Sequence, residues 1–327
     1  EDIFASYVMG TWDIGALRVI GGVRVENTRF SAVGNQVEVD DDGNYTVTAR
    51  AADSSYTNVL PGLHLRWNAS DDWVLRFAAN KTVSRPSFGD ISPRTATNAG
   101  DEEVRLGNPE LDPYESRNID LSLERYIGKS GILSLGLFHK SIDGYIVNTV
   151  TEDDAAYGGF EVTRVINGDK ATVRGAEFNY QQQLDFLPAG FDGLLVGASG
   201  TWLDTGFDAG IADRAGEDFM LPRASKHVYT AHVGYEKGGL STRVAAVYRS
   251  EYLDTIGSDG RAYDIFVAPN TQLDFSLDYR FTPRVSMYFE AQNLLDKPLE
   301  LYQGVRSRTL QNEEYGRTYA LGLKVAL

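Results

Sequence analysis

The amino-acid sequence predicts an all-β protein, specifically a transmembrane antiparallel up-and-down β-barrel. Three observations predict this fold: apolar and polar residues alternate with a period of two, the predicted strands are long, and the connections between them alternate between short and long. Helix-period patterns are scarce in the 327 residues. No apolar run approaches the roughly 20 residues that a membrane-spanning helix needs.

The alternation is clearest over residues 273–281. Leu273, Phe275 and Leu277 are separated by polar residues, so this strand has one apolar face and one polar face. The same division appears over 73–80, 119–124 and 285–292. A soluble sandwich with one wet sheet face also alternates, so this pattern alone does not require a membrane.

Strand length favours the membrane barrel. Most of the predicted strands exceed the length of about 5–6 residues that is common in globular proteins, and they match the ~9–11 residues or more of a tilted membrane strand. In chain order, about thirteen strands are predicted, at residues 2–12, 16–32, 56–69, 72–85, 115–127, 131–150, 169–184, 193–204, 225–236, 239–252, 270–281, 284–295 and 314–326.

The connections between these strands support the same fold. Short connections are predicted at 13–15, 69–71, 128–130, 187–190, 237–239 and 282–283. Long connections alternate with them at about 33–55, 86–114, 151–168, 205–224, 253–269 and 296–313. A membrane barrel has tight turns on the periplasmic side and long loops outside, whereas a sandwich has no reason to place all its long loops at one end.

Two compositional features accompany this pattern. Aromatic residues fall toward strand ends, as interface girdles require, although aromatics are enriched in strands of every kind. They are Trp12, Trp67, Trp73, Trp202, Tyr126, Tyr229, Tyr235, Tyr248 and Tyr319. Acidic residues cluster in the long connections, at 40–42, 101–103, 152–154, Asp213 and 217–218. These runs are interpreted as solvated loop surface, and a calcium or other cation site is the less favoured alternative.

Charge and composition exclude several functions. The chain carries 31 basic and 46 acidic residues, a net charge of −15, which argues against nucleic-acid binding. Cysteine is absent, so disulfides, thiolate metal sites and cysteine nucleophiles are excluded. His64, His139, His227 and His232 share no metal-ligand spacing, and no nucleophile or phosphate-loop motif occurs. The sequence therefore predicts neither an enzyme nor a bound cofactor or metal.

A series of short motifs carries a family resemblance. Among them are TVSRPS at 82–87 and GNPELDP at 107–113, and the others lie at 115–118, 138–143, 167–168, 173–177, 221–222, 225–227, 248–250, 293–298 and 314–319. In this order and spacing they resemble the β-barrel domain of TonB-dependent outer-membrane receptors. Most of these residues have scaffold explanations: Asn-Pro and Asp-Pro steps shape loops, and Gly175 permits a close approach.

The resemblance implies that residues 1–327 are the C-terminal portion of a receptor barrel. Receptors of this family resemble a barrel of 22 strands that encloses a plug, and this chain supplies about thirteen of them. The plug, the TonB-coupling segment and the first strands are then missing. An odd number of strands cannot close such a barrel, so this piece alone is not expected to transport. The chain ends at Ala326-Leu327 and not on the aromatic residue usual for these barrels, which puts its recognition by the barrel-assembly machinery in doubt or indicates that a few residues were cut.

The implied function is TonB-dependent active uptake of a scarce, bulky nutrient across the outer membrane of a Gram-negative bacterium. The implied partners are TonB with ExbB and ExbD, acting through the missing N-terminal region, the outer-membrane lipid and a small nutrient ligand. The style of 84–87 and 108–111 favours a carbohydrate or oligosaccharide over a ferric siderophore. An anionic ferric chelate would also favour arginine clusters without the acidic runs.

Six residues in the predicted external loops are the candidate ligand contacts. The connection at 86–114 is the longest, and long ordered loops are often functional. The candidates are Arg94, Asn98, Arg105, Tyr157, Arg214 and Arg306.

Two alternatives from other classes stay open at this point. A passive porin-like channel would be excluded by a plug and a coupling segment upstream in the full gene. A secreted all-β glycan-binding or adhesion module would require the apolar faces at 273–281 and 285–291 to be buried in a core between sheets.

Overall fold

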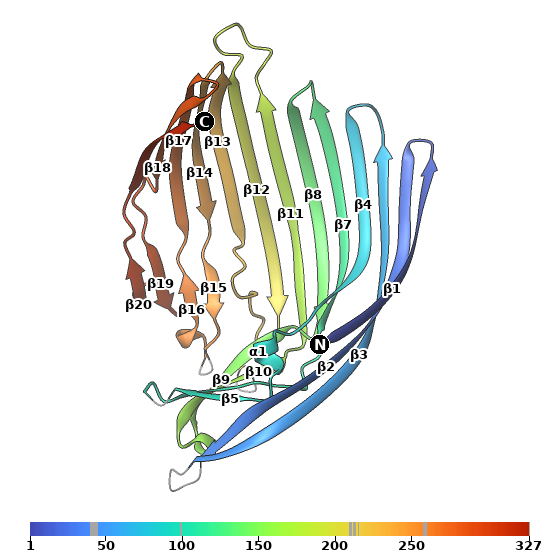
Figure 1. The fold of residues 1–327 in the computed structure, drawn as a ribbon, viewed down its shortest axis with the longest axis vertical. Helices are drawn as coiled ribbons and strands as arrows, with labels where there is room; N and C mark the ends of the chain where they lie inside the picture. The colour runs from blue at the N-terminus through green and yellow to red at the C-terminus, as the bar shows by residue number, and fades with distance from the viewer. Residues whose placement is uncertain are drawn as a thin grey trace.

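The main feature of the structure, a computed structural model that describes residues 1–39, 45–98, 100–208, 211, 214, 216–257 and 260–326, is one large curved sheet (Figure 1). In this part of the chain, thirteen antiparallel strands pair in the order β1-β2-β3-β4-β7-β8-β11-β12-β13-β14-β17-β18-β21. Their bounds are β1 Asp2–Ile14, β2 Leu17–Val39, β3 Tyr45–Asn68, β4 Trp73–Ser84, β7 Tyr114–Ile127, β8 Gly131–Asp143, β11 Lys170–Gln183, β12 Leu194–Phe207, β13 His227–Lys237, β14 Leu240–Arg249, β17 Asn270–Thr282, β18 Val285–Gln292 and β21 Thr318–Val325. The predicted all-β fold and the predicted number of strands are confirmed.

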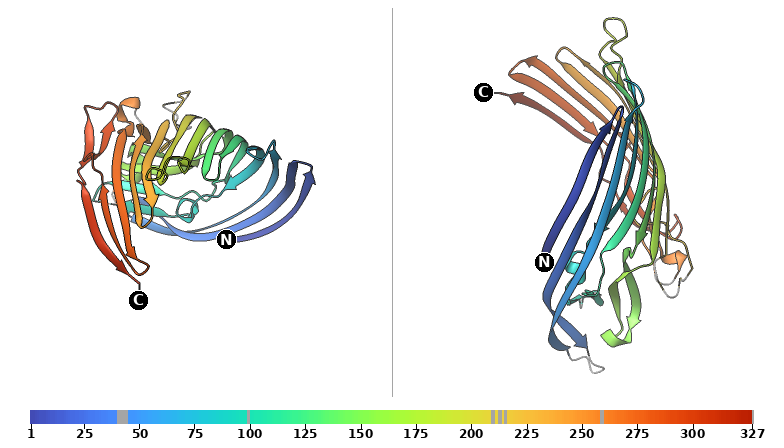
Figure 2. Two further views of the ribbon diagram at one scale, coloured as in Figure 1. Left: turned by 90° about the horizontal axis from the view of Figure 1, so that it is seen from above. Right: turned by 90° about the vertical axis from the view of Figure 1, so that its right-hand side faces the viewer.

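The connections have the predicted two-ended arrangement. Short turns lie at one end of the sheet and the long connections at the other (Figure 1). Gly15 and Gly128, in two of the short turns, have φ of 60° and 57°, a backbone conformation that glycine adopts without steric cost. The sheet curves into an incomplete barrel wall whose strand order ends at β1 and β21 (Figure 2).

The two faces of the sheet differ in polarity. Strand register places Leu75, Leu123 and Leu135 side by side on one face, which we call the outer face. It places Arg76 beside Ser122 on the opposite, inner face. Leu277 pairs with Thr242 and Phe289 on the outer face. The apolar residues of β17 therefore belong to one face of a single curved sheet, so the two stacked sheets that the secreted module required are not what the described chain forms.

The predicted long connection at 33–55 is wrong. The strands β2 and β3 continue through this region and stay paired from Leu17↔Trp67 to Val39↔Tyr45. The sequence there carries Gly34, Asn35 and Gln36 in place of a clear apolar face. Where the hairpin projects beyond the membrane its outer face meets no lipid, so the sequence there needs no continuous apolar face. The acidic run at 40–42 lies outside the described residues.

The predicted strand at 131–150 is two strands. The first, β8, ends at Asp143, and Gly144 then turns the chain with φ of 70°. The amide of Gly144 donates to the carbonyl of Asp169 at 3.1 Å, and the next strand starts at Ile146 in a different sheet. The strands predicted at 239–252 and 284–295 are likewise shorter, and they end at Arg249 and Gln292. The strand predicted at 314–326 begins only at Thr318.

The long connections contain structure of their own. One four-stranded sheet has the order β5-β6-β10-β9 and is built from β5 Thr95–Asn98, β6 Glu103–Leu106, β10 Phe160–Asn167 and β9 Ile146–Asp154. Another has the order β15-β16-β19-β20 and is built from β15 Tyr252–Thr255, β16 Ile265–Val267, β19 Leu299–Gln303 and β20 Thr309–Glu313. The short helices are α1 Phe88–Ile91, η1 Ala155–Tyr157 and η3 Arg261–Tyr263. Among the described residues, no helix has the length and apolar character needed to cross a membrane.

Candidate functional site

The segment around α1 lies against the inner face of the long β2–β3 hairpin. Ile91, Leu111 and Val165 form a buried cluster, and Phe30 of β2 and Ile146 of β9 pack against it. A side chain at Gly34 would come within 2.5 Å of the Pro93 carbonyl oxygen, so this glycine permits the close approach. Seen from above, α1 lies within the curve of the large sheet (Figure 2).

Local hydrogen bonds hold α1 in place. Ser87 caps the helix, because its hydroxyl accepts a hydrogen bond from the Asp90 amide at 3.2 Å. The Asp90 carboxylate accepts from Arg105 Nη2 at 3.1 Å, which ties the helix to β6. Strand β6 pairs in parallel with β10, so the connections at 85–113 and 144–169 form one unit.

Four of the six predicted contact residues belong to this unit. Arg94 is exposed between α1 and β5. Asn98 donates to Asp101 at 2.5 Å, and Arg105 is half exposed beside Asp90. Tyr157 lies in η1, where the Arg164 guanidinium is 6.0 Å from its ring centroid. The structure thus brings Arg94, Asn98, Arg105 and Tyr157 into one loop unit, as polar groups at the mouth of the barrel wall.

Arg214 has a different environment from the one expected of a ligand contact. It is 3% exposed, and its guanidinium donates to Asp264 at 2.5 and 3.2 Å and to the Gly257 carbonyl at 2.9 Å. Glu217 accepts another bond at 2.7 Å. Burial alone disfavours the charged guanidinium, but these ion pairs outweigh it and raise the pKa of Arg214. The Arg214 guanidinium therefore joins the connection between β12 and β13 to the connection between β14 and β17.

Arg306 lies apart from the first four residues, beside the second loop sheet. It is more than half exposed, 3.6 Å from the Glu300 carboxylate, and 6.0 Å from the centroid of the Tyr302 ring. The Tyr302 hydroxyl donates to Glu251 at 2.9 Å. This bond joins β19 to the end of β14.

Tyr302 provides a pH prediction. Burial, followed by the hydrogen bond to anionic Glu251, raises the pKa of Tyr302 from 10.0 to about 12. Because the neutral phenol is favoured in the fold, this stabilisation is present below pH 10 and is lost as the pH rises through about 12. Absorbance titration of wild type and Tyr302→Phe should show that the variant lacks one tyrosine that ionises late. Identical curves for the two proteins would contradict the assignment.

A buried polar cluster near the start of α1 was missed by the sequence analysis. Arg85 donates to Glu26 at 2.5 Å and to Thr28 at 3.1 Å, and the Thr28 side chain is fully buried. Asn58 donates to Glu115 at 3.0 Å beside it. Arg85 lies inside the motif TVSRPS, so the motif was the available signal, but it was interpreted only as scaffold.

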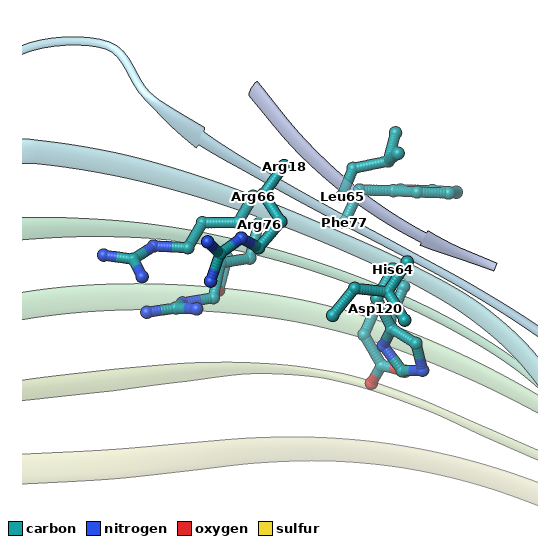
Figure 3. Close-up of a pocket in the computed structure, with 10 residues that line it drawn as sticks. Arg18, His64, Leu65, Arg66, Arg76, Phe77 and Asp120 are labelled. Atoms are coloured by element: carbon teal, nitrogen blue, oxygen red, sulfur yellow. The ribbon is translucent and has the colours of Figure 1, made fainter. Parts of the chain in front are cut away.

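Farther along the inner face toward the short turns, the wall holds a groove of about 400 Å³ (Figure 3). Arg18, Arg66 and Arg76 are cross-strand neighbours there, and His64 and Asp120 lie beside them. Arg18 pairs with Asp13 at 2.7 Å and Arg76 with Glu124 at 2.7 Å. The inner wall is therefore lined by hydrogen-bonding groups and balanced charge.

The part of these loops that the structure describes offers no metal-ligand cluster. Within the described ranges, no group of three or more His, Asp or Glu residues could hold a metal ion. Two of the described acids make local contacts: Asp154 caps η1 and pairs with Arg164, and the Asp218 carboxylate accepts from the Phe207 amide. Asp213 lies outside the described residues.

An apolar outer face, a polar inner face and loops gathered at one end are the features of a transmembrane β-barrel. The model of the TonB dependent receptor-like β-barrel family matches residues 1–294, and the chain belongs to that family. This family places the chain in the outer membrane of a Gram-negative bacterium.

Individual relatives agree with this assignment. An iron-regulated outer membrane virulence protein of Vibrio cholerae is 25% identical over 284 residues, which are 84% of this chain and 40% of the relative. The copper transporter OprC matches 99% of this chain with a TM-score of 0.72 at 16% identity, over 48% of its own length. The ferric yersiniabactin uptake receptor FyuA from Yersinia pestis matches 99% with a TM-score of 0.68 at 18% identity, over 45% of its own length. The chain thus spans less than half the length of these relatives.

Proposed function

We propose that this chain is the C-terminal part of a receptor that takes up a metal chelate across the outer membrane by TonB-dependent active transport. The family match over residues 1–294 carries the proposal. The fold adds a polar inner wall along which a hydrophilic ligand could pass, and a mouth built from ordered loops.

A metal chelate replaces the carbohydrate that the sequence favoured. The relatives are named for iron regulation, ferric yersiniabactin uptake and copper transport, and none of these names supports a carbohydrate. Arg94 and Arg105 lie in the same loop unit, and a chelate with carboxylate or phenolate oxygens would suit their guanidinium groups.

The whole receptor would contain more than this chain. The sheet has two end strands, β1 and β21, and a membrane barrel needs every strand paired on both sides. We therefore propose that further strands close the barrel and that a plug fills it. TonB with ExbB and ExbD would act through that remaining part, and the barrel-assembly machinery would insert the barrel into the membrane.

Uptake by cells tests the proposal. A strain that lacks the receptor gene is grown under iron or copper limitation, with and without a plasmid copy of the full-length receptor, and is supplied with a panel of radiolabelled ferric and cupric chelates. Uptake that the plasmid restores, and that requires TonB, supports the proposal. Uptake that continues without TonB would indicate a passive channel, and uptake of oligosaccharides alone would return the assignment to carbohydrate.

Among the candidate contacts, Arg94 and Arg105 provide the sharpest test. Replacing both with alanine in the full-length receptor should weaken ligand binding at least about tenfold, because charge-assisted hydrogen bonds contribute ~1.5–3 kcal/mol each. Barrel insertion should be unchanged. The matched control is Lys129→Ala with Arg284→Ala, which removes two exposed cations at the opposite end of the sheet. Equal affinity of both double variants for the transported chelate would remove the α1 unit from the site.

A further inference from the structure

The outer face changes character over strands β11 to β14. Over β4, β7 and β8 it carries bulky cross-strand rows, such as the row Leu75, Leu123, Leu135. One row over this region consists of alanines instead, because Ala198 pairs with Ala231, and Ala231 pairs with Ala246. Tyr180 and Leu273 stand at the two ends of this row. Three adjacent strands therefore share a shallow floor between taller side chains.

Aromatic side chains wall this floor on the side of the long loops. Tyr229 pairs with Gly200 and with Tyr248, and the two tyrosine rings stack with centroids 6.0 Å apart. A side chain at Gly200 would come within 2.9 Å of the Tyr229 ring, so the ring leans over the glycine. Phe178 and Trp202 complete the wall.

The result is a long apolar depression, which we call the outer groove. A cavity of about 650 Å³ follows the aromatic wall, and a neighbouring one of about 460 Å³ is lined by Val196, Val233 and Val244 on the side of the short turns. The two cavities share Ala198, Ala231 and Ala246. The outer groove therefore continues from the aromatic wall toward the middle of the apolar face.

The outer groove lies at the border of the membrane-facing band. Next to Ala176 and Trp202 along β11 and β12, the outer face becomes charged, and Arg174 pairs with Asp204 at 2.6 Å there. Arg174 is 66% exposed. Tyrosine and tryptophan at such a border are typical of the level of lipid headgroups.

We propose that the outer groove binds one acyl chain of a lipid of the surrounding membrane as an ordered ligand. The groove is continuous with the face that contacts lipid, and its alanine floor offers no side-chain hydrogen bond, so its occupant is a hydrocarbon chain. The aromatic wall limits the chain on one side and the valine row on the other. The headgroup lies at the level of the charged pair Arg174–Asp204, where the apolar face ends.

Photocrosslinking tests this proposal in the full-length receptor. The receptor is reconstituted in vesicles that contain a trace of phosphatidylethanolamine with a diazirine on one acyl chain, and labelled peptides are mapped by mass spectrometry. Labelling should concentrate in the peptides of β12, β13 and β14. The double variant Ala231→Phe and Ala246→Leu fills the groove and should reduce labelling there by about tenfold.

The matched control is Leu321→Phe with Leu323→Phe, which adds volume on the same outer face outside the groove, and it should leave the labelling pattern unchanged. Uniform labelling along the outer face, or equal labelling of the filled variant, would overturn the proposal. Crosslinks to a second receptor copy at these strands would also overturn it, because they would show a protein occupant. Chelate uptake is measured in parallel, so failure of the proposed function is seen separately.

Discussion

Replacing Asp264 with alanine should destabilise the packing between the described parts of the β12–β13 and β14–β17 connections by about 3–5 kcal/mol, because it leaves the Arg214 charge buried without its main partner. Both residues are 3% exposed, so water cannot replace the lost carboxylate without opening the loops. The effect should be local, since the thirteen paired strands do not depend on this ion pair. Hydrogen exchange of loop amides in the full-length receptor should accelerate by about a hundredfold or more.

Glu217→Gln is the control for this experiment. Glu217 bonds the same guanidinium, but its side chain is 47% exposed, so solvent screens this pair and its loss should accelerate loop exchange far less than the loss of Asp264. If the two variants exchange at similar rates, the buried pair does not hold the loops together.

Leu277→Arg should cost ~2–4 kcal/mol in barrel stability if the residue lies near the midplane of the membrane. Leu277 lies on the outer face in a row with Thr242 and Phe289, and the new charge would meet hydrocarbon. Assembly of the full-length receptor into vesicles, followed by a denaturant titration, measures the loss.

Ser276→Arg provides the comparison, because the neighbouring residue points to the inner face between Arg243 and Glu290. This substitution should change stability by much less, since its charge meets the polar lumen. Equal losses for the two variants, or normal stability of Leu277→Arg, would contradict the assignment of the two faces.

The strands that cross the membrane were predictable from the sequence, whereas the structure outside it was not. Inside the bilayer, the two faces meet opposite environments, so Leu273, Phe275 and Leu277 alternate with polar residues. Beyond it, that requirement disappears, so the sequence around Gly34 gave no sign that β2 continues to Val39. The loop sheets pair segments far apart in the chain, such as Glu103–Leu106 with β10, and such pairing leaves no local signal.

The candidate site was likewise predictable only where its residues lie close together in the chain. Arg94 and Arg105 lie in the longest connection, which is the sequence signal for a site, and the structure places them in one unit with Asn98 and Tyr157. Arg214 looked equivalent in the sequence, because a loop arginine has the same local pattern whether it faces solvent or a buried acid. Its partner Asp264 is 50 residues away, so only the tertiary structure could reveal the pair.

The parallel pairing of β6 with β10 has a mechanical consequence. It joins the segment between β4 and β7 to the segment between β8 and β11, so neither can swing independently over the opening. Force applied to one is transmitted to the other through four backbone pairs, from Glu161↔Glu103 to Arg164↔Leu106. Insertions or deletions in either segment would shift this shared edge, so the lengths of the two segments are constrained together.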